Sequence, residues 1–508
     1  MGTLSYLLDG FLVALTWQNL LFAFFGVLIG TMVGILPGIG PTSGVALLIP
    51  VTATLTAGLV PEAAATSAII MLAGVYYGAM YGGSTTSILL NTPGEASSVV
   101  TVLDGFPMAK QGRAGAALSI AAIGSFFAGI VSIIGLILIA KPLSNFALKL
   151  GPAEIFSLMI LGLCALTGLA GKSMTKALLM TTIGLFFATI GVDQVSGVAR
   201  FTFNIPQLFS GVEFLTMAVG LFALGEVFSY LIERYNSERM VAKITRIFPT
   251  KQDLKDSAGP ITRGSVLGFF QGIVPGAGAS LASFLSYILE KKISKNPEKF
   301  GKGAIEGVAG PEAANNAASG GALVPLLTLG IPGSPTTAVL MGALIMYNIK
   351  PGPLLFDENP QVVWGLIASM FIGNFMLLVL NMPLVRIFAK IIETPPKYLI
   401  PIIAAFSIFG VYAVQLSIFQ LGLLVFFGLM GYFCGKFDYP IAPMVLALVL
   451  GPMIEYNLRR ALTISDGSFA IFVNKPLSAM FLLIALLWIA IPFIMKMKGK
   501  KVIVNEEG

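Results

Sequence analysis

Four short stretches of this 508-residue chain place Pro-Gly pairs close to hydroxyl and amide side chains. We call Pro37-Gly38-Ile39-Gly40 and Pro275-Gly276-Ala277-Gly278 the first breaks, and Asn91-Thr92-Pro93-Gly94 and Gly330-Ile331-Pro332-Gly333 the second breaks. Because Pro and Gly interrupt helices, they leave backbone N–H and C=O groups unpaired. At membrane depth such groups are tolerated only beside protein or a water-filled cavity. Helix N-termini suit a carboxylate and unpaired carbonyls suit a cation, so the breaks predict an ion-binding site.

The candidate substrate contacts are the break residues and the neutral polar residues near them. They are Pro37, Gly38, Gly40, Ser84, Thr85, Thr86, Asn91, Thr92, Pro93, Gly94, Pro275, Gly276, Gly278, Asn315, Asn316, Pro332, Gly333, Ser334, Thr336 and Thr337. None is Lys or Arg, so an anion would be bound by dipoles and hydroxyls and balanced by a co-transported cation. An alternative stays open for any single glycine, because small residues also let membrane helices pack closely.

Three carboxyl groups near the breaks, Glu62, Glu95 and Glu312, are candidates for coupling transport to a cation. An ionised side chain inside a membrane costs about 2.5 kcal/mol or more, so it needs a partner or a function. Each of the three also fits an interfacial loop or a helix N-terminus, and that alternative stays open. The coupling ion would be sodium or a proton, and sodium bound at the helix breaks is one possibility.

The breaks belong to an internal duplication. Residues 30–40 recur as residues 268–278 with every Gly and Pro in register, and residues 91–98 correspond to residues 330–337. Two linked matches indicate a repeated unit. We therefore expect a first transmembrane repeat at 1–240, a basic cytoplasmic linker at 241–262, a second repeat at 263–495 and a cytoplasmic tail at 496–508.

Composition places these repeats in a membrane. With 56% hydrophobic and 11% charged residues, the chain has more apolar surface than one soluble core can bury. Its apolar runs approach the roughly 20 residues that cross a bilayer. The prediction is an all-α, multi-pass membrane protein with about eleven spans and two re-entrant hairpins.

Basic residues constrain the topology of the second hairpin. Seven Lys or Arg occur between Arg234 and Arg263 and five between Lys291 and Lys302, so both flanks of residues 264–290 should be cytoplasmic. Five spans between the two copies, near 63–81, 113–140, 153–170, 172–191 and 210–232, would invert the second copy. Inverted repeats are typical of secondary transporters. A miscount by one span would instead make the repeats parallel.

Several classes of function are disfavoured by composition. The chain has no histidine, which excludes His-ligated metal sites and Ser-His catalysis built from its own residues. Its two cysteines, Cys164 and Cys434, lie in apolar runs and do not form a disulfide framework. Residues 168–173 end in Gly-Lys-Ser but lack the first glycine of a P-loop. We therefore expect no enzyme, and no nucleic-acid partner.

With these motifs in view, nearly the whole chain resembles the large permease subunit of the tripartite tricarboxylate transporters, the TctA family. The resemblance rests on residues 34–40, 81–95, 104–110, 275–278 and 330–337. It implies uptake of a small carboxylate across the bacterial inner membrane, driven by an ion gradient. It also implies a small four-helix membrane subunit, a periplasmic carboxylate-binding protein, and an elevator-like motion of the hairpins.

Two other functions remain to be distinguished by experiment. A passive anion channel could also use paired re-entrant hairpins, but it would never accumulate its substrate. An intramembrane lipid-modifying enzyme would need an acid–base pair or a metal motif, and neither is evident in the sequence.

Overall fold

The computed structural model describes residues 3–36, 40–169, 173–193, 196–233, 248–275, 278–384, 387 and 396–497. Helices make up the regular structure of these ranges, apart from a two-residue antiparallel pair, β1 (Gly191–Val192) and β2 (Ala199–Arg200). Within these ranges six helical stretches are long and apolar enough to cross a membrane, namely Trp17–Ile35, Pro61–Leu90, Ala114–Ala147, Phe214–Ile232, Pro360–Asn381 and Ile418–Lys436. The protein is therefore an all-α, multi-pass membrane protein, and eleven spans stays a prediction.

The first copy of the repeat forms a helical hairpin followed by a long helix. Its elements are α2 (Trp17–Ile35), α3 (Gly40–Thr56), α4 (Pro61–Leu90), the 3-10 turn η1 (Ala96–Ser98) and α5 (Val99–Lys110). Before them, α1 (Thr3–Ala14) packs along α17 (Pro360–Asn381). Proline at the first position of α4 costs no hydrogen bond, because that N–H has no partner in any helix.

The second copy corresponds to the first. Its elements are α11 (Lys251–Ile273), α12 (Gly278–Ile293), the 3-10 turn η4 (Pro297–Lys299), α13 (Glu306–Gly321), α14 (Leu323–Leu329) and α15 (Pro335–Met346). It differs by the added turn η4, by α13 and α14 in the place of α4, and by α15 in the place of η1 and α5. Helix α11 begins at Lys251, so residues 251–262 of the predicted linker are helical, while residues 241–247 lie outside the described ranges.

The start of α11 is fixed by a reciprocal cap. The Thr250 hydroxyl accepts from the Asp253 N–H at 3.1 Å, and the Asp253 carboxylate accepts from the Thr250 N–H at 2.9 Å. Burial raises the pKa of Asp253, but the bonds from Thr250 and Arg113 outweigh burial and hold that pKa below its usual value.

The remaining helices pack beside the two copies. They are α6 (Ala114–Ala147), α7 (Pro152–Leu169), α8 (Met174–Ala188), the 3-10 turn η2 (Pro206–Leu208), α9 (Phe214–Ala218), the π turn η3 (Val219–Leu224), α10 (Gly225–Glu233), α16 (Leu355–Glu358), α17 (Pro360–Asn381), α19 (Pro396–Gln415), α20 (Ile418–Lys436), α21 (Ala442–Ile464), α22 (Ile471–Asn474) and α23 (Pro476–Met497). Helix α6 packs against α4 of the first copy and against α11 and α13 of the second, so it joins the two copies.

Glycines set how closely the helices of each copy approach. A Cβ at Gly34 of α2 would lie 2.2 Å from the Ala79 carbonyl of α4, and a Cβ at Gly272 of α11 would lie 2.2 Å from the Ala318 carbonyl of α13. Ala79 and Ala318 are themselves 239 residues apart, which is the spacing of the repeat. The two copies therefore use the same backbone-to-backbone packing, in which no larger residue fits.

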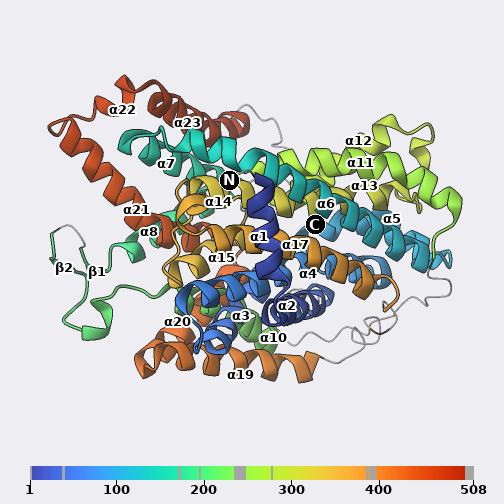
Figure 1. Cartoon of the computed structure of the whole chain (residues 1–508), viewed down its shortest axis with the longest axis horizontal. Coiled ribbons are helices and arrows are strands. Elements are labelled where there is room, and N and C mark those ends of the chain that lie inside the picture. The colour runs from blue at the N-terminus through green and yellow to red at the C-terminus, as the bar shows by residue number, and fades with distance from the viewer. Residues whose placement is uncertain are drawn as a thin grey trace.

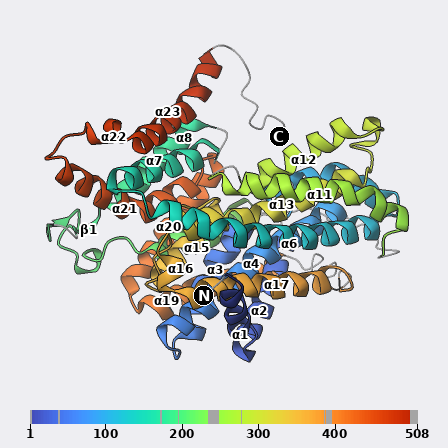
Figure 2. The same cartoon turned by 45° about the horizontal axis from the view of Figure 1, so that its top comes forward.

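The molecule is elongated, with different elements at its two ends (Figure 1). Helices α5, α11 and α12 reach one end, and the β1–β2 pair and α22 lie at the other. Figure 2, turned by 45°, keeps the same separation.

Candidate functional site

The first breaks give α3 and α12 equivalent starting residues. Gly40 has φ +59° and Gly278 has φ +65°, a left-handed conformation that favours glycine. A Cβ at either position would meet nothing within 4 Å, so both glycines border open space. Pro37, Gly38 and Gly276 lie outside the described residues, and Pro275 is the last described residue before its gap.

The second breaks are also equivalent, but they are tightly packed. Asn91 and Gly330 both adopt the left-handed region, with φ 57° and 68°. A Cβ at Gly94 would lie 2.2 Å from the Gly34 carbonyl, and one at Gly333 would lie 2.8 Å from the Cα of Ala322. These two glycines are therefore required by packing in the described structure.

One residue after each second break, the two copies carry different side chains on the same backbone. Glu95 and Ser334 both have φ −150° and ψ 166° and lie 239 residues apart. The Ser98 hydroxyl accepts from the N–H of Glu95 at 3.3 Å, as the Thr337 hydroxyl does from the N–H of Ser334 at 2.8 Å. The first copy thus has a carboxyl group where the second has a hydroxyl.

Helices α3 and α12, which start at the first breaks, each meet the element that follows the second break of the other copy, α15 and η1 respectively, and we call these two meeting points the crossings. At one crossing, the Thr42 and Thr336 hydroxyls lie 2.9 Å apart and join the starts of α3 and α15. Nearby, the Tyr76 hydroxyl lies 3.3 Å from the Ser334 hydroxyl. At the other crossing, α12 packs against η1, which follows Glu95.

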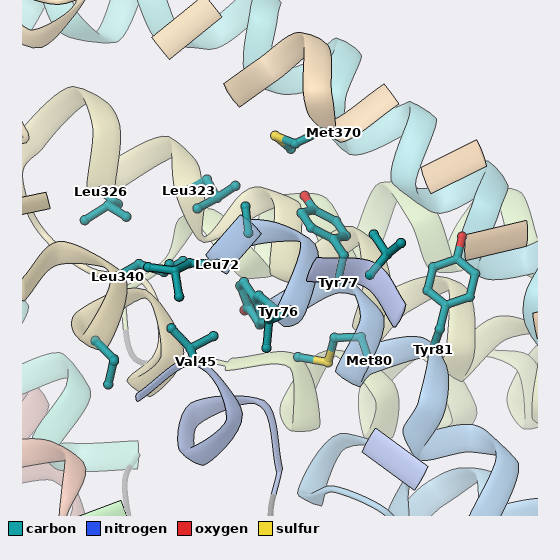
Figure 3. Close-up of a cluster of buried hydrophobic side chains, with 14 of the residues drawn as sticks. Val45, Leu72, Tyr76, Tyr77, Met80, Tyr81, Leu323, Leu326, Leu340 and Met370 are labelled. Carbon is teal, nitrogen blue, oxygen red and sulfur yellow. The ribbon is translucent and has the colours of Figure 1, made fainter. Parts of the chain in front are cut away.

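The buried environment of the first crossing comes from both copies. Figure 3 shows Tyr76, Tyr77 and Tyr81 along α4, with Leu323 and Leu326 of α14 and Leu340 of α15 on the Tyr76 side of this row and Tyr81 at the other side. All six side chains are buried. Polar groups in this region must therefore pair within the protein or with a ligand.

Two carboxyl groups lie inside the protein near the second crossing. Glu312 of α13 is fully buried, and its carboxyl group accepts from the Thr101 hydroxyl and, at 3.3 Å, from the Asn315 amide. Glu95 accepts from the Ser97 hydroxyl and interacts electrostatically with Glu312. No ion pair among the described residues involves either carboxyl group.

Asn316 completes this cluster and leaves one atom without a partner. Its amide nitrogen faces the Asn315 side-chain oxygen at 2.6 Å, the Ser125 hydroxyl at 2.7 Å and the Glu312 carbonyl at 3.0 Å. The Asn315 side-chain oxygen and the Glu312 carbonyl can only accept, so the Asn316 amide nitrogen, which donates, is correctly placed beside them. The Asn316 Oδ1 atom is buried and has no hydrogen-bond partner.

The other candidate residues are placed less directly. Ser84 and Thr86 donate to backbone carbonyls of α4, at 2.8 Å and 3.2 Å, and Thr85 is buried on the same helix. Thr92 donates to the Leu90 carbonyl at 3.3 Å, while Pro93 is half-buried and Pro332 buried. Glu62 is exposed in the first turn of α4, apart from the buried carboxyl cluster.

Several residues of the site were not singled out from the sequence. When the two copies are aligned at an offset of 239 residues, Tyr76 and Tyr77 fall on Asn315 and Asn316. The alignment could therefore have identified these two tyrosines as site residues. No sequence pattern identified Thr42 or Thr101 as site residues, because their hydrogen-bond partners lie more than 200 residues away in the chain.

Asp104 joins the two copies at the α5 end of the molecule. Its Oδ1 atom accepts from the N–H groups of Gly301, Gly303 and Ala304 at 2.8–2.9 Å, and its Oδ2 atom accepts from the Tyr287 hydroxyl at 2.9 Å. Asp104 is completely buried. It therefore fixes α5 of the first copy to α12 and to the loop before α13.

Comparison with known proteins gives matches along the whole chain. Residues 20–446 match the family described as "Tripartite tricarboxylate transporter TctA family". An uncharacterized 52.8 kDa protein of Agrobacterium vitis, from the TAR-I ttuC′ 3′ region, is 44% identical over 509 residues and is covered completely by the alignment, as is this chain. A second uncharacterized protein of Agrobacterium vitis, from the TAR-II ttuC′ 3′ region, is 43% identical over 234 residues, which cover 46% of this chain and 97% of that protein. No solved structure matches.

Proposed function

Because the chain belongs to the tripartite tricarboxylate transporter TctA family, we propose that it is a secondary active permease for a small di- or tricarboxylate. Uptake across the bacterial inner membrane would be coupled to a cation and would depend on a periplasmic binding protein. The observation that carries the proposal is the pair of crossings, where the helix after each first break meets the element that follows the second break of the other copy.

The first crossing has the chemistry of a carboxylate site. Helices α3 and α15 both begin there, and helix N-termini favour an anion. Thr42, Thr336 and Ser334 add hydroxyl groups, and Gly40 leaves open space beside them. The sequence-predicted contacts Ser334, Thr336 and Thr337 gather at this crossing.

The second crossing has the chemistry of a coupling site. Glu95 and Glu312 are buried without a basic partner among the described ion pairs, and an uncompensated buried carboxylate is expensive. A co-transported sodium ion or proton would offset that cost. This difference between the crossings supports transport of an anion together with a cation.

Contacts between helix ends support the inverted arrangement of the two repeats. Arg113, just before α6, pairs at 2.5 Å with Asp253 in the first turn of α11, and both are expected on the cytoplasmic side. Near the other end of α6, Lys141 pairs with Asp357 of α16 at 2.6 Å, and the Ser144 hydroxyl donates to the Pro353 carbonyl at 2.6 Å, where the periplasmic side is expected. Each contact joins segments that the inverted topology puts on the same side of the membrane.

Membership in a tripartite family implies further subunits. We propose that these are a small four-helix membrane subunit and a periplasmic carboxylate-binding protein. The hairpins would move together against the surrounding helices, since α6 and Asp104 connect the two copies.

Reconstitution tests this function. The permease, its small subunit and its binding protein would be placed in vesicles with an imposed sodium or proton gradient, and uptake of labelled carboxylates would be measured. We expect accumulation above equilibrium under one of the two gradients. Flux that never exceeds equilibrium, or unitary currents in a bilayer recording, would instead favour the passive anion channel.

A further inference from the structure

Asn316 Oδ1 is the only buried side-chain oxygen of the cluster around Glu312 that lacks a hydrogen-bond partner among the described residues. An amide oxygen is a good acceptor, and leaving one buried and unpaired costs about 1–3 kcal/mol. Rotating the amide would not help, because its nitrogen already faces the oxygens of Asn315 and Glu312. The oxygen therefore needs a donor or a positively charged ion.

The Glu312 carboxyl group supplies the negative charge that such an ion requires. Residues 312 and 316 are four apart on α13, so their side chains lie on the same helix face. Both Glu312 oxygens already accept hydrogen bonds, from Thr101 and Asn315, but complete burial disfavours the ionised carboxylate more strongly than these bonds favour it, so a bound cation would have to compensate its charge. A buried, ionised carboxylate needs a counter-charge, and neither Lys nor Arg pairs with it among the described residues.

We propose that Glu312, Asn316 and Thr101 hold one sodium ion between α13, α5 and α6. The assignment rests on the proposed cation-coupled transport and identifies the ion and its ligands. The ligands are a carboxylate, an amide oxygen and a hydroxyl, which are the oxygen donors that hard cations prefer. One carboxylate matches the single charge of a monovalent ion.

The first copy lacks equivalent ligands at the corresponding positions, so the site occurs only once. Tyr77 stands where the second copy has Asn316, and Ala73 stands where it has Glu312. An alanine provides no charge and a phenol no amide oxygen, so the repeat offers no second site of this kind. The proposed ion site is therefore specific to the second copy.

Sodium binding can be measured on the purified full chain without any transport. The midpoint of thermal unfolding would be followed while NaCl replaces choline chloride at constant ionic strength. A ligand that binds only the folded state raises the midpoint with its concentration. We expect the midpoint to rise with sodium but not with potassium or choline.

Variants then test the ligands. Asn316→Leu removes the unpaired oxygen and should weaken apparent sodium affinity by about tenfold or more, which is the usual scale for disturbing an ion's ligand environment. Glu312→Gln should abolish the sodium response. Asn457→Leu is a matched control, because Asn457 is also buried and its amide also donates to the carbonyl four residues earlier, at 2.8 Å. It should bind sodium like the wild type.

If Asn316→Leu does not fold, Thr101→Val and radioactive sodium binding provide a second measurement, with several-fold weaker binding expected. A sodium response that survives in Glu312→Gln and Asn316→Leu would overturn the assignment. So would stabilisation that depends on pH and is indifferent to sodium, since a proton would then be the ion.

These results separate the ion site from the transport function. Sodium-driven uptake that is unaffected by Asn316→Leu would refute the site and leave the function intact. Sodium binding that the variants weaken, in a protein that never accumulates carboxylate, would support the site and refute the function.

Discussion

Removing the Asp104 carboxylate should separate the two copies of the repeat at one end of the molecule. The change to alanine leaves three backbone N–H groups and the Tyr287 hydroxyl without their acceptor. Hydrogen bonds to a charged group contribute about 1.5–3 kcal/mol each, so four would sum to about 6–12 kcal/mol. Neighbouring bonds are not additive, and water can reach the exposed residue Gly301 in the variant. We therefore expect Asp104→Ala to lower the free energy of unfolding by about 3–5 kcal/mol.

Equilibrium unfolding of the purified protein in detergent measures this loss, and two variants calibrate it. Tyr287→Phe removes one donor to the charged carboxylate and should cost about 1.5–3 kcal/mol. Asp357→Ala removes a salt bridge to Lys141 whose side chains are 54% and 42% exposed, and should cost less than about 1 kcal/mol.

The comparison between the two aspartates decides the outcome. If Asp104→Ala is no less stable than Asp357→Ala, the four bonds do not hold the copies together and the reasoning is refuted. If the free energy of unfolding falls as expected, carboxylate uptake can then be measured in Asp104→Asn. This variant removes the charge but keeps an amide oxygen that can still accept from the three N–H groups.

Three further changes test other parts of the structure. Gly272→Ala should cost about 1–3 kcal/mol of unfolding free energy because its Cβ would meet a backbone carbonyl 2.2 Å away, whereas Gly422→Ala, with nothing within 4 Å, should cost nothing in the same denaturation assay. Gly278→Leu should insert into membranes but lose carboxylate uptake in vesicles, because its side chain would fill the open space at the start of α12; uptake at the wild-type rate would remove Gly278 from the site. The pKa of Asp253 is lower in the folded state than its usual value of about 4, so its contribution to stability is present above that value and is lost as the pH falls through the lower one. The difference in unfolding free energy between the wild type and Asp253→Asn should therefore be constant between about pH 7 and 5 and shrink below about pH 4.

The duplication made much of the fold predictable. The breaks were located by Pro and Gly at a fixed spacing, and the matching backbone angles of Asn91 and Gly330 agree with that register. The apolar run also predicted where α6 begins, since the expected span 113–140 starts within one residue of the observed helix (Ala114–Ala147), which continues seven residues further. Such features are local, so the sequence carries them directly.

The arrangement of the site was less predictable, because it depends on contacts between distant segments. No local pattern distinguishes the packed Gly94 from the open Gly40, since both stand beside a proline. Substrate contact by Asn315 and Asn316 stays a prediction, and their hydrogen bonds to the Glu312 carboxyl and carbonyl groups could not be read from the sequence. Glu312 and the exposed Glu62 both lie in Pro-Glu-Ala-Ala sequences, so only the packing of α13 and α4 separates them.

The first crossing also has a consequence for biosynthesis. Thr42 and its partner Thr336 are 294 residues apart in the chain. At about 5–20 residues per second, a ribosome needs about 15–60 s to make the second residue after the first. During that interval the Thr42 hydroxyl has not yet met its partner on α15. This contact of the first crossing can therefore form only late in synthesis, after most of the chain has been made.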